Sequence, residues 1–134
     1  MISAPTALQR FQGGLMLHLN AIYVLGYGPA ELGEARRGGG GWSGTRDTYR
    51  EPEPPRLGLT PPSKDLVEPI LGFGKAWREQ YGGPDGSLGW AVGEERSESA
   101  DWQLFDNGII AVSQSGEGFV LYYHEGRIWE QKNR

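Results

Sequence analysis

The chain has no cysteine and only two histidines among its 134 residues. The lack of thiols excludes a disulfide framework, a cysteine-ligated zinc site and a thiol nucleophile. Two imidazoles are too few for a histidine-rich metal centre. We therefore expect no metal site and no bound cofactor.

Basic charge and long apolar runs are also scarce. Thirteen Lys and Arg stand against 17 Asp and Glu, which gives a net charge of −4, whereas nucleic-acid-binding domains carry clustered basic charge. The charge-free run over residues 11–30 contains Gln12, His18 and Asn20 and several glycines. A membrane-spanning helix needs about 20 dominantly apolar residues. The sequence thus predicts neither a nucleic-acid partner nor a membrane span.

Glycine is abundant instead. The 22 glycines and nine prolines point to many turns, and the apolar stretches between them are short and rich in β-branched and aromatic residues. Ile70, Phe73, Trp77 and Tyr81 recur at helical spacing within the second half of the chain. We therefore predict a mainly β, antiparallel fold with one short helix.

Two stretches of the sequence repeat each other. The segment "QRFQGGLMLHLNAIYVL" begins at residue 9, and "QLFDNGIIAVSQSGEGFVLYY" begins 94 positions later. The glycines Gly14 and Gly108 are matched in this alignment, and after two extra residues in the second copy residues 23–25 match residues 119–121. Each copy is predicted to form β-hairpins, with both matched glycines at positive φ in their turns.

The repeat suggests a division into three parts. Residues 1–28 read as a half repeat unit forming a β-hairpin, residues 29–63 as a Gly/Pro-rich linker or surface strap, and residues 64–134 as a complete unit with a helix and β-hairpins. The predicted core consists of Phe11, Leu15, Leu17, Tyr23, Leu25, Phe73, Trp77, Leu88, Trp90, Phe105, Ile109, Phe119 and Leu121.

The second half of the chain resembles LGFP-type repeats. The stretch "FGKAWREQYGG…GSLGWAVGEE…WQLFDNGIIAV…GFVLYY" has the family's order of helix with Trp, Gly-Gly turn, Leu-Gly-aromatic segment and Phe-x-x-Gly hairpin. It departs from the family at Trp90-Ala91, where Pro is frequent. This Leu-Gly-Trp variant is similar to repeats in large surface proteins of Chloroflexi-type bacteria. The positions that carry the resemblance are Trp77, Gly82, Gly83, Leu88, Gly89, Glu95, Phe105 and Gly108.

The resemblance implies a non-catalytic module, extracellular or on the cell surface, that binds cell-wall or other glycans. Aromatic side chains are the natural platforms for sugar rings, so the candidate ligand-binding residues are Trp42, Tyr49, Trp102, Tyr122 and Tyr123. A glycosidase needs two carboxyl groups facing each other about 5–10 Å apart, and the acids of this chain stand in polar turns. We therefore predict no catalytic residue.

The amino-terminal hairpin suggests an alternative function. A lone two-stranded hairpin is marginally stable in water, so its leucine face and free edges need a partner. That partner is either the complete unit of the same chain or that of a neighbouring chain. Pairing between chains would make a structural, self-assembling protein, and we expect a homo-oligomer formed through this hairpin.

Overall fold

The computed structural model describes residues 2–27, 38–123 and 128–133, and it is mainly β with one short α-helix among them. The predicted fold class, antiparallel β with one short helix, is confirmed. The elements are β1 (Ile2–Phe11), β2 (Gly14–His18), β3 (Ile22–Gly26), β4 (Gly38–Thr45), α1 (Leu71–Gln80), the 3-10 helix η2 (Gly83–Asp85), β5 (Arg96–Phe105), β6 (Gly108–Ser113), β7 (Glu117–Tyr122) and β8 (Ile128–Asn133).

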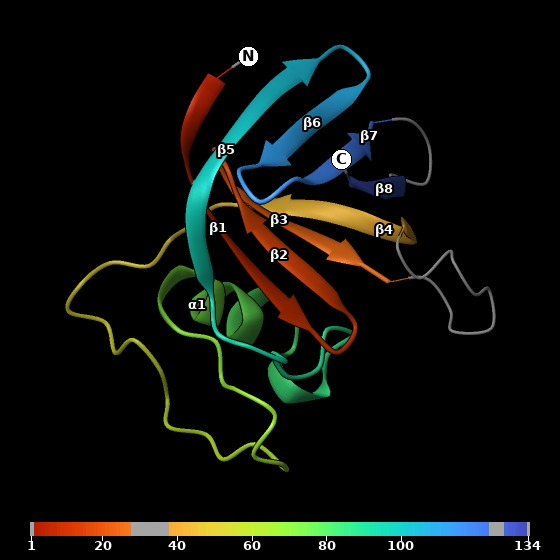
Figure 1. The fold of residues 1–134 in the computed structure, drawn as a ribbon. Coiled ribbons are helices and arrows are strands. Elements are labelled where there is room, and N and C mark those ends of the chain that lie inside the picture. Colours follow the sequence, from red (N-terminus) through yellow and green to blue (C-terminus); the bar gives the residue numbers. More distant parts are fainter. Residues whose placement is uncertain (1, 28–37, 124–127, 134) are drawn as a thin grey trace.

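The eight strands form one closed antiparallel barrel in the order β1-β2-β3-β4-β8-β7-β6-β5 (Figure 1). Strands β1–β4 follow one another as one meander and β5–β8 as another, and we call these the first and second meanders. Two seams join them, β1 against β5 and β4 against β8. Strand β4 lies within residues 29–63, the range read from the sequence as a linker or strap.

The two meanders have the same pairing scheme. Phe11 pairs with Gly14 between β1 and β2, and Phe105 pairs with Gly108 at the equivalent place between β5 and β6. At the β1–β5 seam Pro5 pairs with Ser99, the residue 94 positions later. Each meander therefore faces its counterpart across the seam in matched register.

The barrel interior is filled by large apolar side chains. In strands, alternate residues point to opposite faces, so these residues come from every second position of each strand. Two tryptophans make matched hydrogen bonds: Trp42 Nε1 donates to the carbonyl oxygen of Tyr122 at 2.9 Å, and Trp129 Nε1 donates to that of Gly26 at 2.8 Å. The interior cluster comprises Leu8, Leu15, Leu17, Leu19, Tyr23, Leu25, Trp42, Trp102, Ile109, Ala111, Phe119, Leu121 and Trp129.

A second apolar cluster lies outside the barrel, on the outer face of β1, β2 and β3. There the connection between β4 and β5 packs Phe73 and Trp77 of α1, together with Leu88 and Trp90, onto the sheet. We call residues 64–92 the cover; Figure 1 shows its helix α1 beside β1 and β2. Its backbone is fixed at the β1–β2 turn, where the Gly13 amide donates to the Leu88 carbonyl at 2.9 Å.

One predicted core residue is wrong. Phe105 is 44% exposed, whereas its match Phe11 is 1% exposed. The difference arises because the cover lies over Phe11 and no described segment lies over Phe105 in the same way. The other predicted core residues are all buried.

The predicted positive φ angles at Gly14 and Gly108 are also wrong, because neither glycine adopts one. Both are needed for space instead. A Cβ at Gly14 would overlap the carbonyl oxygen of Leu25 on β3, and a Cβ at Gly108 would overlap that of Leu121 on β7. Close strand packing, rather than turn geometry, requires glycine at both positions.

The backbone edges of the amino-terminal strands are occupied within the chain. Strand β1 pairs with β5 over residues 2–8, and β4 pairs with β8. The free edges that led us to expect exchange of the hairpin between subunits are therefore closed by the second meander of the same chain.

Candidate binding face

The five aromatic residues proposed from the sequence lie in three places. Trp42 and Trp102 are buried in the barrel interior. Tyr49 lies on the connection between β4 and β5, where its hydroxyl donates to the carbonyl oxygen of Glu53 at 3.0 Å. Tyr122 and Tyr123 lie at the end of β7, and Tyr123 is 40% exposed.

The structure brings three of these five residues together. The ring centroids of Trp42 and Tyr123 are 5.9 Å apart, and the Trp42 indole donates to the Tyr122 carbonyl. Tyr23 also packs against Trp42 at 5.9 Å, and its hydroxyl donates to Asn20 Oδ1 at 2.7 Å. Burial, with the nearby Tyr123 hydroxyl, raises the pKa of Tyr23. Trp42 is thus a support for exposed Tyr123 rather than a contact surface itself.

A larger exposed surface lies on the outside of the second meander. Because Trp102, Ile109, Phe119 and Leu121 point into the core, the alternate residues of the same strands point outward. We call this surface the open face. Its residues form rows across the strands: Phe105, Gly108 and Tyr122; then Gln103, Ile110, Val120 and Glu130; then Asp101, Val112, Gly118 and Lys132.

The first row of the open face has two aromatic residues with a glycine between them. Phe105 on β5 and Tyr122 on β7 are both paired in register with Gly108 on β6. Two strand spacings separate the aromatic residues, which is about 10 Å. Since Gly108 has no side chain, no side chain of β6 stands between the two rings.

The second row has two apolar residues in its middle and a polar residue at each end. Ile110 and Val120 are half-buried between Gln103 and Glu130. The Tyr122 hydroxyl donates to Glu130 Oε1 at 3.2 Å, and Lys132 Nζ lies 3.3 Å from Glu130 Oε2. Desolvation and the charge of Glu130 raise the pKa of Tyr122, so its hydroxyl stays protonated. This side of the open face therefore presents groups that can form hydrogen bonds with a hydroxylated ligand.

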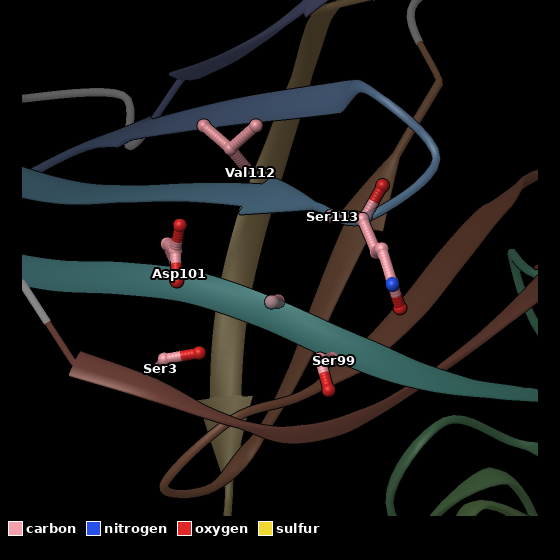
Figure 2. Close-up of a pocket in the computed structure, with 7 residues that line it drawn as sticks. Ser3, Ser99, Asp101, Val112 and Ser113 are labelled. Atoms are coloured by element: carbon pink, nitrogen blue, oxygen red, sulfur yellow. The ribbon is translucent and has the colours of Figure 1, made fainter.

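The third row opens into a groove of about 320 Å³ at the β1–β5 seam. Figure 2 shows Asp101 on β5 between Val112 of β6 and Ser3 of β1, with Ser99 farther along the strand. We call this the polar groove. It is lined by Ser3, Ser99, Ala100, Asp101, Val112, Ser113 and Gln114.

The main cluster of charges lies around Glu117, at the other end of β7 from Tyr122, and its members are paired. Glu117 Oε2 lies 2.5 Å from Arg10 Nη2, and Glu117 Oε1 lies 2.5 Å from Arg96 Nη2. Burial alone would raise the pKa of Glu117, but hydrogen bonds from Arg96 and Arg10 outweigh it and lower the pKa below its usual value. Arg10 also donates to the Tyr27 hydroxyl at 3.3 Å. These contacts join β1, β5 and β7 and stabilise the fold.

Glu68 is a buried carboxylate that the sequence did not single out. Its oxygens accept from the backbone amides of Leu57, Gly58 and Leu59 at 2.9–3.1 Å, and Arg78 lies 4.0 Å away. Each oxygen therefore has protein partners, and the residue fixes the proline-rich connection to the cover. No spacing in the sequence marks this role.

Sequence reasoning also missed Phe105 as a surface residue. A signal was present: the chain has two matched hairpin regions but one helix with a following Leu-Gly-Trp segment. A single segment of this kind buries one hairpin face, so the matched face of the other is left open. Comparing the number of helix-containing segments with the number of hairpin regions predicts that one hairpin face is left uncovered. It does not predict which of the two faces that is.

Comparisons with protein-family models, curated proteins and solved structures find no match to this chain. The resemblance to LGFP-type repeats therefore stays a prediction. Within the part of the chain that the structure describes, no helix has the length and apolar character needed to cross a membrane.

Proposed function

We propose that this protein is a non-catalytic, extracellular or cell-surface module that binds cell-wall or other glycans on its open face. One observation carries the proposal: the same sheet face is buried under the cover in the first meander and exposed in the second. Phe105, 44% exposed, is the clearest sign of that difference. Large exposed apolar surfaces with polar surroundings commonly mark binding sites.

Residues of the second meander prevent a segment like the cover from docking on its outer face. Asn107 stands where the first meander has Gly13, and a Cβ at Gly13 would overlap the Ser87 carbonyl oxygen of the cover. Ile22, buried beneath the cover, is matched by Gly118, which offers no apolar contact. A segment like the cover therefore cannot dock on the open face in the same way, and the face is available to another ligand.

A glycan suits the chemistry of the open face. Sugar rings have apolar C–H faces and polar edges, and they stack on aromatic rings while their hydroxyls bond to neighbouring polar groups. Phe105 and Tyr122 supply an aromatic ring on each of two strands whose backbones are about 10 Å apart, and a sugar ring can stack on either of them. Gln103, Glu130 and the Tyr122 hydroxyl supply hydrogen-bonding groups beside them.

The carboxylates of the open face are too far apart for hydrolysis. Asp101 lies on β5 and Glu130 on β8, three strands away, which is about 14 Å between backbones. Glycosidases hold their two carboxyl groups about 5–10 Å apart. This separation supports binding without cleavage.

Calorimetric titration of the full chain with soluble cell-wall oligosaccharides tests the proposal. Phe105→Ala and Tyr122→Ala should each weaken binding about tenfold, since truncating a central aromatic contact costs more than about 1 kcal/mol. Leu57→Ala is the matched control, because Leu57 is 59% exposed on the connection. If both aromatic variants bind as tightly as the wild type, or no oligosaccharide binds, the proposal is wrong.

Self-association through the open face is the competing outcome. In that case Phe105→Ala would convert a dimer into a monomer in sedimentation, and oligosaccharide would not be needed. A wild type that is monomeric at all accessible concentrations, together with loss of sugar binding in Phe105→Ala, favours the glycan.

A further inference from the structure

We infer that the polar groove is a subsite of the open face that selects a sugar bearing a protonated amine. The inference rests on the proposed function, because it assigns the class of sugar bound beside the aromatic row. It concerns the groove of Figure 2 and the carboxylate of Asp101 within it.

The groove lies on the same outer face of the barrel as the aromatic row. Asp101 and Phe105 point to the same face of β5 and are four residues apart, which is about 14 Å along a strand. Between them lie Gln103 and, across the pairing, Ile110 of β6. An oligosaccharide stacked on Phe105 and running along β5 therefore reaches the groove within a few sugar units.

Asp101 brings an uncompensated negative charge to the groove. Its register partners are Ser3 on β1 and Val112 on β6, neither of which is a cation. The other lining residues are small, apolar or uncharged, so hydroxyl and amide groups surround the carboxylate. Among the described residues, no Lys, Arg or His forms an ion pair with Asp101.

The positive charge nearest in the same row is already paired. Lys132 lies 3.3 Å from Glu130 on its own strand. The described part of the open face thus offers a free carboxylate and no free cation. Such a face disfavours uronate and phosphate groups, accepts neutral sugars and favours an ammonium group.

The first meander shows that the fold does not require this carboxylate. The match of Asp101 there is Ala7, partly buried and packed against the cover cluster. Both residues occupy the same register position on the outer face of matched strands. A partly buried alanine and a half-exposed carboxylate serve the same pairing, so the charge of Asp101 is free to serve ligand selection.

An ammonium group that donates to Asp101 makes a charge-assisted hydrogen bond, which is shorter and stronger than the bond from a neutral hydroxyl or amide. The groove is open to water, and screening reduces the gain. We therefore expect a preference of about tenfold for an amino sugar over its N-acetylated form.

The experiment compares three oligosaccharides of equal length on the full chain by calorimetry at mildly acidic pH: glucosamine, N-acetylglucosamine and galacturonic acid oligomers. Glucosamine oligomers should bind about tenfold more tightly than N-acetylglucosamine oligomers, and galacturonic acid oligomers should bind most weakly. Asp101→Asn should remove the preference, so that glucosamine and N-acetylglucosamine oligomers bind with similar affinity. The preference should also shrink as salt is added.

Asp85→Asn is the matched control. Asp85 is exposed in η2, within the cover, and the substitution changes the net charge by the same amount. A preference that persists in Asp101→Asn, or disappears equally in Asp85→Asn, overturns the inference. If N-acetylglucosamine oligomers bind in a Phe105-dependent way but no preference exists, the inference alone fails. If none of the three oligomers binds the wild type, the proposed function fails with it.

Discussion

The two meanders share a pairing scheme and differ in what lies on their outer faces. In the first, Phe11, Met16, Ile22 and Val24 are sealed beneath the cover. In the second, the matched positions are Phe105, Ile110, Gly118 and Val120, and the face is open. Both halves fill the barrel interior with large apolar side chains, whereas their outer faces differ in whether a segment covers them. A small number of outward side chains decides whether a sheet face becomes core or binding surface.

The turn between the first two strands of each meander makes this choice visible. At Gly13 the backbone approaches Ser87 so closely that a Cβ has no room. Asn107 occupies the matched position, yet the turn itself is alike. The backbone amide of Tyr27 donates to the Gly13 carbonyl, and the backbone amide of Tyr123 donates to the Asn107 carbonyl, both at 2.9 Å. The same turn can therefore pack against the cover when this position is glycine, as at Gly13, and cannot when it has a side chain, as at Asn107.

The largest expected effect compares Phe11→Ala with Phe105→Ala. Phe11 is fully buried, so its truncation should lower the free energy of unfolding by about 3–5 kcal/mol. Phe105 is exposed, and its truncation should change stability by less than about 1 kcal/mol. Denaturant titration measures both, and equal losses would mean that the second face is also covered in solution.

The second comparison exchanges the turn residues. Gly13→Asn should destabilise by about 1–3 kcal/mol, because the new side chain collides with the backbone of the cover. Asn107→Gly should change stability by about 0.5 kcal/mol or less, as at other exposed positions. Exposure of Trp77 and Trp90 in Gly13→Asn can be followed by tryptophan fluorescence. A stable variant with a docked cover would show that Gly13 is not the determinant.

A third comparison uses the matched tryptophans. Trp42→Phe and Trp129→Phe each remove one indole N–H and leave a carbonyl without that donor. Each should cost about 1–3 kcal/mol, and the two costs should be similar. Thermal melts of the two variants test whether the barrel halves carry equal weight. A loss of stability in only one of the two variants would show that the matched tryptophans do not contribute equally.

The smallest effect concerns pH. Glu117 has a lowered pKa in the fold, so its ion pairs stabilise the protein above the ordinary glutamate pKa. That stability is lost as the pH falls through the lowered value. Its match in the first meander, two residues before Tyr23, is Ala21, so the contribution comes from one end of the barrel only. Glu117→Gln should lower stability at neutral pH by about 1 kcal/mol, because the groups are partly exposed. The gap from wild type should close in acid, and a constant gap would contradict the assignment.

Much of the barrel follows from local sequence. The matched hairpins, the apolar alternation of Leu15 and Leu17, and the helical stripe through Phe73 and Trp77 all signal their elements. Burial of Phe105 could not be judged in this way, because it depends on what covers the strand and not on the strand itself. The sequence repeat made Phe105 look like Phe11, and the asymmetry lies in a segment elsewhere in the chain.

Strand β4 shows the limit of propensity more sharply. Its sequence, "GGGGWSGT", has five glycines and a single β-branched residue, Thr45, so local preference predicts a linker. It forms a strand because β3 and β8 both supply backbone partners, and because Trp42 is buried in the core. Tertiary context overrides local preference here. The same limit applies to the candidate aromatic residues. The sequence identifies them as aromatic, but only the closed barrel shows that Trp42 is buried and Tyr123 is exposed.

The positions of the first residue of β1 and the last residue of β8 have a mechanical consequence. Ile2 begins β1 beside Trp102, whereas Asn133 ends β8 beside Glu117, at the opposite end of the barrel. A pulling force between these residues acts along both strands and loads their flanking hydrogen bonds in shear. Many bonds must then break together instead of unzipping one at a time. The closed barrel is thus arranged to resist tension along its axis.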